Sequence, residues 1–194
     1  MRRLLPGVLW LFALAVVVPQ AGATTARQLT DEELTTRAKL IVVGRQVESK
    51  TVWVGRLLVT RVTVAVGEIL KGQAPSTVTV DIPGGIDMNR RIPIGMSVPG
   101  APTIHSGEHV VLFLSRREGI TAQAGSSEYA IVGFSQGKFS VVEEAQGRQV
   151  VITGAGQAAK TPLGEFKAKI QMYVSRQGVR ERPSPRVLPA GEED

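Results

Sequence analysis

Residues 57–66 read LLVTRVTVAV, an alternation that predicts a β-strand. Side chains of an extended chain point to its two faces in turn, so one face carries Leu58, Thr60, Val62, Val64 and Val66. The runs LIVVG at residues 40–44 and TVTVDI at residues 77–82 have the same β-rich, apolar character. Three such runs in close succession indicate a mainly β protein.

Further strands are predicted downstream. VVLFL at residues 110–114 has the length and composition of a buried strand. Three more runs follow, at residues 129–134, 138–142 and 149–153, with turns at Ser135-Gln136-Gly137 and around Gly147. Many short strands separated by glycine-containing turns are typical of an antiparallel barrel or sandwich.

Two helices flank the predicted strands. LTDEEL at residues 29–34 contains a capping box, in which Thr30 and Glu33 satisfy each other's backbone amides, so a short N-terminal helix is expected over residues 31–39. Thr161-Pro162 is expected to begin a C-terminal helix. The apolar face of that helix would carry Leu163, Phe166, Ile170, Tyr173 and Val174 and pack against the β domain.

The front of the chain has the three parts of a cleavable signal peptide. Met1-Arg2-Arg3 is basic, residues 8–18 are uninterruptedly apolar, and Ala21-Gly22-Ala23 supplies small residues for cleavage. We therefore expect cleavage between Ala23 and Thr24 and a secreted or periplasmic location; an uncleaved N-terminal anchor is the alternative. The domain prediction is a signal peptide at 1–23, one β domain at 24–177 and a disordered tail at 178–194.

Composition narrows the classes of partner. Without the signal peptide, 21 basic residues face 17 acidic ones, and the basic residues are scattered, so nucleic-acid binding is not expected. No later segment is long and apolar enough for stable membrane insertion after cleavage. The chain contains no cysteine, which excludes a lipoprotein anchor.

Residues 105–109, HSGEH, match the H-x-x-E-H pattern of inverted zinc peptidases. That chemistry needs both histidines on one helical face, whereas Gly107 inside the motif and the apolar run after it predict a turn entering a strand. We therefore assign no metal, no cofactor and no catalytic residue. A zinc hydrolase that uses this turn is the third of three functional hypotheses.

The connection from Pro83 to Gly107 is unusually long and holds four prolines and five glycines. Connections of this length in a compact domain are usually functional or mobile. Arg90 and Arg91 lie within it and are candidate partner-binding residues, with solvated loop charges as the alternative.

AKLIVVGRQV at residues 38–47 and VTVAVGEILKG at residues 62–72 resemble the opening strands of netrin-like domains, which include the tissue inhibitors of metalloproteinases. SGEHVVLFL at residues 106–114 resembles a later strand of the same fold. VGFSQGKF at residues 132–139 resembles a group of uncharacterised exported bacterial proteins of similar length. The resemblance covers residues 35–142 and implies an OB-like (netrin-like) antiparallel barrel.

The same resemblance implies a protein partner, and one candidate is a secreted metalloprotease. Inhibitors of that family chelate the protease zinc through an N-terminal cysteine clamped by disulfides, and here Thr24 takes that place without a cysteine. OB-type barrels bind ligands across one face and the adjoining loops, which here would include Arg90 and Arg91. The first hypothesis is an exported non-enzymatic binding module for a protein or envelope component, and the second is a metalloprotease inhibitor or partner.

Overall fold

The structure is a computed structural model that describes residues 27–117, 127–153 and 160–180. The predicted signal peptide, its cleavage site at Ala23 and Thr24, and residues 181–194 of the predicted tail lie outside the described residues. The described chain is mainly β, as expected, with one short and one long helix.

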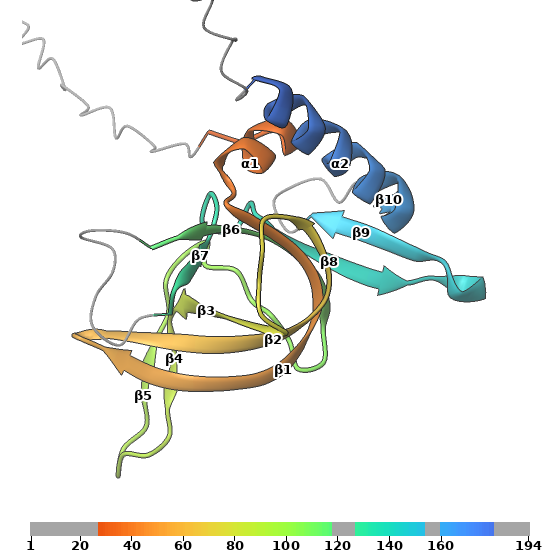
Figure 1. The fold of residues 1–194 in the computed structure, drawn as a ribbon. Helices are drawn as coiled ribbons and strands as arrows, with labels where there is room; N and C mark the ends of the chain where they lie inside the picture. Colours follow the sequence, from red (N-terminus) through yellow and green to blue (C-terminus); the bar gives the residue numbers. More distant parts are fainter. Residues whose placement is uncertain (1–26, 118–126, 154–159, 181–194) are drawn as a thin grey trace, which may run out of the picture.

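Ten strands and two α-helices make up the described fold (Figure 1). The helices are α1 (Asp31–Arg37) and α2 (Leu163–Arg180). The first five strands are β1 (Leu40–Val54), β2 (Leu57–Lys71), β3 (Thr77–Pro83), β4 (Gly85–Asp87) and β5 (Ile94–Met96). The remaining strands are β6 (His109–Arg116), β7 (Tyr129–Ile131), β8 (Lys138–Glu143), β9 (Gln149–Thr153) and β10 (Lys160–Pro162).

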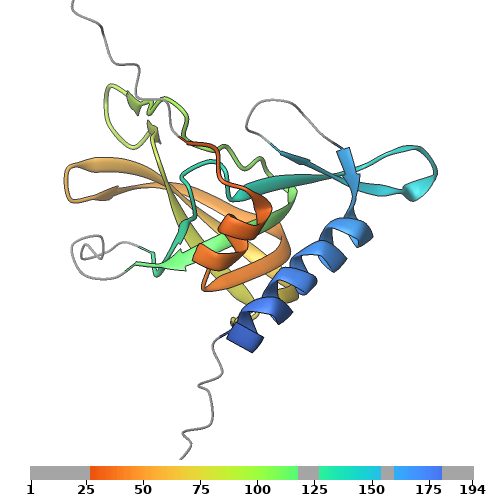
Figure 2. The ribbon, with the colours of Figure 1, turned by 90° about the horizontal axis from the view of Figure 1, so that it is seen from above.

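Eight strands form one sheet in the order β1-β2-β3-β7-β6-β8-β9-β10, and β1 also pairs with β6. This extra pairing bends the first five strands of that order into a partial ring (Figure 1). β8 and β9 extend the sheet beyond the ring, on the side away from the β1–β2 turn (Figure 2). The separate pair β4–β5 forms a small hairpin.

The sheet is mixed, which corrects the prediction of a purely antiparallel arrangement. β3 and β7 run parallel and are joined at one register position, Val80 opposite Tyr129, whereas every other strand pair described is antiparallel. Alternation along a strand reports which side chains share a face but carries no information on the direction of the neighbouring strand. The ring therefore has one short seam that the sequence pattern did not indicate.

β1 and β2 are each 15 residues long, far longer than the predicted runs at 40–44 and 57–66. The outer half of β1 pairs only with β2, and the exposed polar stretch Glu48–Lys50 continues β1 through this pairing. At Gly44 the backbones approach closely, since an added Cβ would lie 2.3 Å from the Ala65 carbonyl oxygen. Gly44 thus allows the beginning of β1 to pair with β2 on one edge and β6 on the other.

Two cores lie on opposite sides of the shared strands. Leu40 and Val42 of β1 belong to the core enclosed by the ring, whereas Ile41 and Val43 belong to the core beneath the helices. β6 alternates in the same way, with Val110, Leu112 and Leu114 inside the ring and Val111 and Phe113 outside. Both faces of these strands are buried, which explains why their sequences are continuous apolar runs.

The helices cover the outer core on the same side of the ring (Figures 1 and 2). The predicted capping box of α1 is confirmed, with Thr30 Oγ1 accepting from the Glu33 amide and Glu33 accepting from the Thr30 amide. α1 ends at Arg37, two residues before the predicted end. α2 buries Leu163, Phe166 and Ile170 as predicted, and the helix includes residues 178–180, which the sequence placed in the tail.

Two connections differ from the sequence expectation. The predicted strand at 129–134 ends at Ile131, because residues 132–137 form turns and Phe134 has a positive φ of 66°. The long connection predicted at 83–107 begins after Pro83, the last residue of β3, and contains the β4–β5 hairpin. Over the described residues, none of the helices is both long enough and apolar enough to cross a membrane.

Candidate binding surface

The β4–β5 hairpin projects from the ring beside the turn that joins β1 to β2 (Figure 1). Its base is fixed by backbone contacts, because the Gly84 amide donates to the Leu58 carbonyl at 2.9 Å and Thr60 Oγ1 donates to the Gly84 carbonyl at 2.8 Å. Gly85 has a φ of 142°, and an added Cβ would lie 2.8 Å from Thr60 Oγ1. Glycine at this position therefore lets the hairpin lie directly against the long strands.

A polar cluster holds the hairpin to β1. The Trp53 indole donates to Asp87 Oδ2 at 2.8 Å, and Arg90 Nε donates to the same oxygen at 3.1 Å. The Arg90 guanidinium also lies 5.3 Å from the centre of the Trp53 ring, in cation–π range. The indole hydrogen bond, a bond from the Asn89 amide and the Arg90 charge lower the pKa of Asp87, so this carboxylate stays ionised.

The two arginines singled out in the sequence therefore have different roles. Arg90 is ion-paired with Asp87 and stacked against Trp53, so it is fixed within the surface. Arg91 is exposed and makes no ion pair with any residue of the described ranges. The same holds for Arg56 at the β1–β2 turn, which sequence reasoning did not single out.

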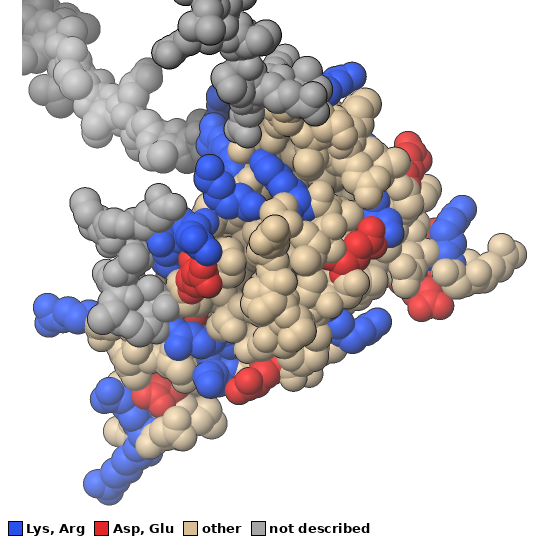
Figure 3. Space-filling view, viewed as in Figure 1, with Lys and Arg blue, Asp and Glu red and all other residues tan. Residues whose placement is uncertain are grey.

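The hairpin is also unusually apolar for an exposed connection. Ile92 is 76% exposed and Met88 is 70% exposed. Together with neighbouring exposed residues they form what we call the tip patch: Trp53, Arg56, Leu57, Ile86, Met88, Arg90, Arg91, Ile92 and Ile94. Figure 3 shows basic side chains gathered at the same end of the molecule, with acidic ones between them.

Sequence reasoning identified Arg90 and Arg91 but missed the apolar part of the tip patch. Residues 86–94 read IDMNRRIPI, and their apolar side chains follow neither a helical nor a strand period. A usable signal was present, because four large apolar residues in a proline- and glycine-rich connection have no core position to fill.

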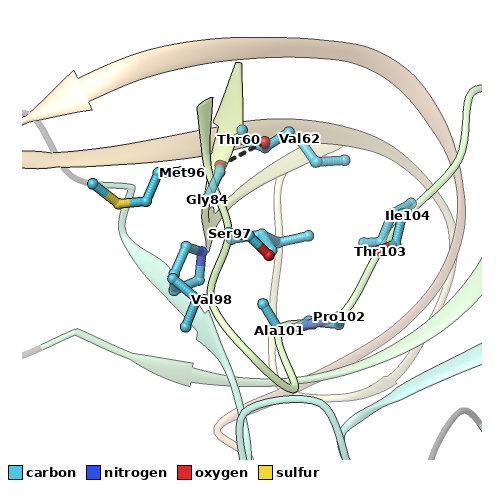
Figure 4. A pocket seen from close by; sticks show the side chains of 13 residues that line it. Thr60, Val62, Gly84, Met96, Ser97, Val98, Ala101, Pro102, Thr103 and Ile104 are labelled. Atoms are coloured by element: carbon cyan, nitrogen blue, oxygen red, sulfur yellow. Dashed lines mark hydrogen bonds between the residues drawn. The ribbon is translucent and has the colours of Figure 1, made fainter. Parts of the chain in front are cut away.

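A cavity of about 260 Å³ lies at the base of the hairpin, between β2, β3 and residues 96–104 (Figure 4). Thr60 and Val62 line it from β2, and Met96, Ser97 and Ile104 line it from the connection. Its lining residues include no charged side chain. The cavity can thus accept a small uncharged group but offers no acid, base or ion-binding chemistry.

The H-x-x-E-H motif is the predicted turn, with Ser106 and Gly107 in the turn and His109 at the start of β6. Glu108 accepts from Lys138 Nζ at 2.6 Å, from Ser140 Oγ at 2.7 Å and from the His105 amide at 2.7 Å. Burial opposes ionisation of this carboxyl, but these hydrogen bonds outweigh burial and lower the pKa of Glu108. Both carboxylate oxygens are therefore engaged by the protein's own donors.

Ser140, Lys138 and Glu108 together resemble a nucleophile with an attached base, a grouping that sequence reasoning missed. Lys138 Nζ donates to Ser140 Oγ at 2.7 Å and also donates to Glu108. Ser140 Oγ donates its proton to Glu108, whose lowered pKa makes that carboxylate a weak base, and the Lys138 ammonium has no lone pair with which to accept a proton. The three side chains therefore form an ion pair and hydrogen bonds that link the turn to β8.

Of the predicted partner-binding residues, Arg90 and Arg91 lie in the described part of the chain, and both belong to the tip patch. Thr24 lies outside the described residues, and Arg27, the first described residue, lies beside α1 at the end of the molecule opposite the hairpin (Figure 1). Gln136 holds this segment, since its side chain accepts from the Leu29 amide at 2.6 Å and donates to the Arg27 carbonyl at 3.2 Å.

A second hollow, of about 470 Å³, lies between the two helices. Lys39, Lys71 and Arg176 line it together with the Tyr173 ring. Lys71 Nζ donates to the Thr35 carbonyl at 2.7 Å and to Gln177 Oε1 at 2.9 Å, so this lysine joins α1 to α2. The contacts of Lys71 therefore show that this lysine helps to pack the two helices together.

Comparison with known protein families, with curated proteins and with solved structures finds no match to this chain.

Proposed function

We propose that this protein is an exported, non-enzymatic binding module built on an OB-like barrel, and that it contacts a protein or other envelope component through the tip patch. An OB-type barrel is a five-stranded, partly open Greek-key barrel. The five-strand partial ring with its short β3–β7 seam supports this assignment. OB-type barrels bind through the loop that joins their first two strands, and the β1–β2 turn with the strand ends beside it contributes Trp53, Arg56 and Leu57 to the tip patch.

The observation that carries the proposal is the exposure of large apolar side chains next to arginines that lack a neutralising partner in the described chain. Contiguous exposed apolar surface rimmed by polar residues marks interaction sites. The Glu108 carboxylate, by contrast, already accepts hydrogen bonds from Lys138 and Ser140. The cavity at the base of the hairpin has no charged side chain in its lining. Binding is therefore the function that the side-chain chemistry favours.

Site-specific photocrosslinking tests this proposal. A photoreactive amino acid at Ile92 is expected to give an adduct in cells that export the protein, whereas the same residue at Met172 on α2 is not. Met172 is a matched control because its side chain is also large, apolar and exposed. Equal adducts from both positions, or none from Ile92, would remove the tip patch as the contact surface.

Inhibition of an extracellular metalloprotease is the second candidate, and the Gln136 contacts favour it. This mechanism needs a positioned N-terminus, and Gln136 fixes the backbone at Arg27 and Leu29, a few residues after the predicted new terminus at Thr24. These Gln136 contacts order the segment without a disulfide. Part of the entropy that binding would otherwise cost is therefore already lost in the free protein.

The free amine of Thr24 must be neutral to ligate zinc, and an α-amino group has an ordinary pKa near 8. Inhibition is therefore expected to weaken as pH falls from about 8 to 6. One extra residue before Thr24 should abolish inhibition, and Gln136→Ala should weaken it. Equal inhibition of a matrixin-type protease by the native and extended proteins would exclude the N-terminal contact.

A further inference from the structure

The apolar side chains of the tip patch surround the hairpin on more than one face. Asp87 pairs with Ile94 across the hairpin, so these two side chains share a face, and Asp87 contacts Trp53 of β1. Ile86 precedes Asp87 and pairs with Gly95, so its side chain lies on the opposite face. Met88 and Ile92 lie in the turn between the strands, at the end of the hairpin.

The charge at this end is positive. Asp87 neutralises Arg90 and is itself satisfied by the Trp53 indole and the Asn89 amide. Arg56 and Arg91 remain without an ion pair among the residues described, so the cluster carries two uncompensated positive charges. Arg56 lies in the β1–β2 turn, Arg91 lies with Met88 and Ile92 between β4 and β5, and β4 contacts both β1 and β2.

The form of the hairpin distinguishes between classes of partner. A flat protein partner on the outer face of the hairpin would cover Ile86 and leave Ile94, which shares the Asp87 face beside β1, in water. A lipid layer surrounds an inserted tip on all sides and also places anionic headgroups at the level of flanking arginines. The segment from Gly85 to Met88, which comprises β4 and the residue after it, extends roughly 10 Å, and this matches the depth of about 5–10 Å reached by interfacial segments.

We propose that the tip patch attaches the protein to the surface of an anionic phospholipid membrane. This inference rests on the proposed function and names the envelope component that the tip patch binds. The attachment is peripheral: Ile86, Met88, Ile92 and Ile94 enter the interface, while Arg56 and Arg91 contact phosphate groups. Trp53 lies at the same level, where an indole ring with a satisfied N–H is stable.

The chain provides its own spectroscopic reporter for this contact. Its tryptophans are Trp10, inside the predicted signal peptide, and Trp53 in the tip patch. In exported protein whose N-terminus has been verified as Thr24, the tryptophan emission therefore comes from Trp53 alone. Vesicles of phosphatidylcholine with about 30% phosphatidylglycerol are expected to shift this emission to the blue, and vesicles of phosphatidylcholine alone are not.

Variants distinguish binding through the tip patch from nonspecific binding to the vesicles. Each arginine near an anionic surface contributes about fivefold to partitioning, so Arg56→Ala/Arg91→Ala should weaken sedimentation with the anionic vesicles about 25-fold. Met88→Ser/Ile92→Ser should weaken it at least tenfold. The matched controls Met172→Ser and Arg176→Ala, both on exposed positions of α2, should bind as the wild type does.

Three outcomes would overturn the inference. Equal binding to neutral and anionic vesicles would show that the arginines do not contribute. An equal loss of vesicle binding in the α2 control variants would show that binding depends on the total charge or general hydrophobicity of the protein. A tip-specific protein adduct from position 92 together with no vesicle binding would replace the lipid by a protein partner and leave the proposed function standing. Circular dichroism of each variant checks that the fold is retained.

Discussion

Asp81 of β3 has a side chain only 3% exposed and is held by donors from two parts of the chain. Arg61 donates to both carboxylate oxygens at 2.7 and 2.9 Å, and the Ser127 amide donates at 2.7 Å. Burial opposes ionisation, but the Arg61 and Ser127 hydrogen bonds outweigh it and hold the pKa of Asp81 below its ordinary value.

Asp81→Asn is therefore expected to cost about 2–4 kcal/mol at neutral pH, because Arg61 would lose its charged partner while remaining partly buried. Since the pKa is lower in the folded state, the Asp81 contribution is fully present above about pH 4 and is lost as pH falls through the lowered pKa. Urea unfolding from pH 7 to 3 should show a shallower acid decline in the variant. The exposed change Glu48→Gln is the control, and a steeper decline in Asp81→Asn would contradict the assignment.

Gly44 and Gly67 allow a matched comparison of the same substitution, glycine to alanine, at two positions. An alanine Cβ at position 44 would lie 2.3 Å from the Ala65 carbonyl oxygen and 2.7 Å from Val64 Cγ1, whereas at position 67 the nearest such atom is 3.6 Å away. Gly44→Ala should therefore destabilise by about 2–3 kcal/mol, and Gly67→Ala should be neutral or gain up to about 1 kcal/mol. Thermal unfolding of both variants measures this, and equal effects would show that the close approach at Gly44 is unimportant.

At the scale of elements, α2 is attached by an aromatic cluster. The Phe166 ring lies 5.0 Å from Phe139 and 6.4 Å from Phe113, measured between ring centres, and Phe166 is buried. Phe166→Ala should cost about 3–4 kcal/mol, as expected for truncating a buried phenylalanine. Met172→Ala, on the exposed side of α2, should stay within about 0.5 kcal/mol. Urea denaturation followed at 222 nm tests both, and a small effect at position 166 would mean that the helix is held elsewhere.

The elements were predictable where their signal is local. The capping box of α1 and the apolar face of α2 follow from spacings within a few residues, and both are confirmed. The parallel contact of β3 with β7 joins Val80 to Tyr129, and no local pattern encodes such a distant pairing. Of the tip patch, Arg90 and Arg91 were found by their charge, whereas Ile86 and Ile94 gain their meaning only when the hairpin places them on opposite faces.

At the scale of the whole molecule, export remains a prediction with a direct test. Mass spectrometry of protein recovered from the periplasm or medium should find Thr24 at the N-terminus, because Ala21-Gly22-Ala23 fits the cleavage site. Removal of residues 1–23 would leave α1 and the contacts of Gln136 with Arg27 and Leu29 in place, so the processed chain should keep the same fold. Intact Met1 on membrane-bound material would instead show an uncleaved anchor.

Ring closure also predicts an order of folding, because β1 has one partner strand next to it in the sequence and one far from it. The β1–β2 hairpin joins Val54 to Leu57 and can form within roughly 1–10 μs, whereas β1 meets β6 through Leu40 and Leu114, which are roughly seventy residues apart. A ribosome adds about 5–20 residues per second, so the apolar edge of β1 waits roughly 4–14 seconds for β6 to be synthesised. During that time Leu40 to Gly44 present unpaired backbone groups to any neighbouring nascent chain. We therefore expect the newly made chain to depend on a holding chaperone that the finished protein no longer needs.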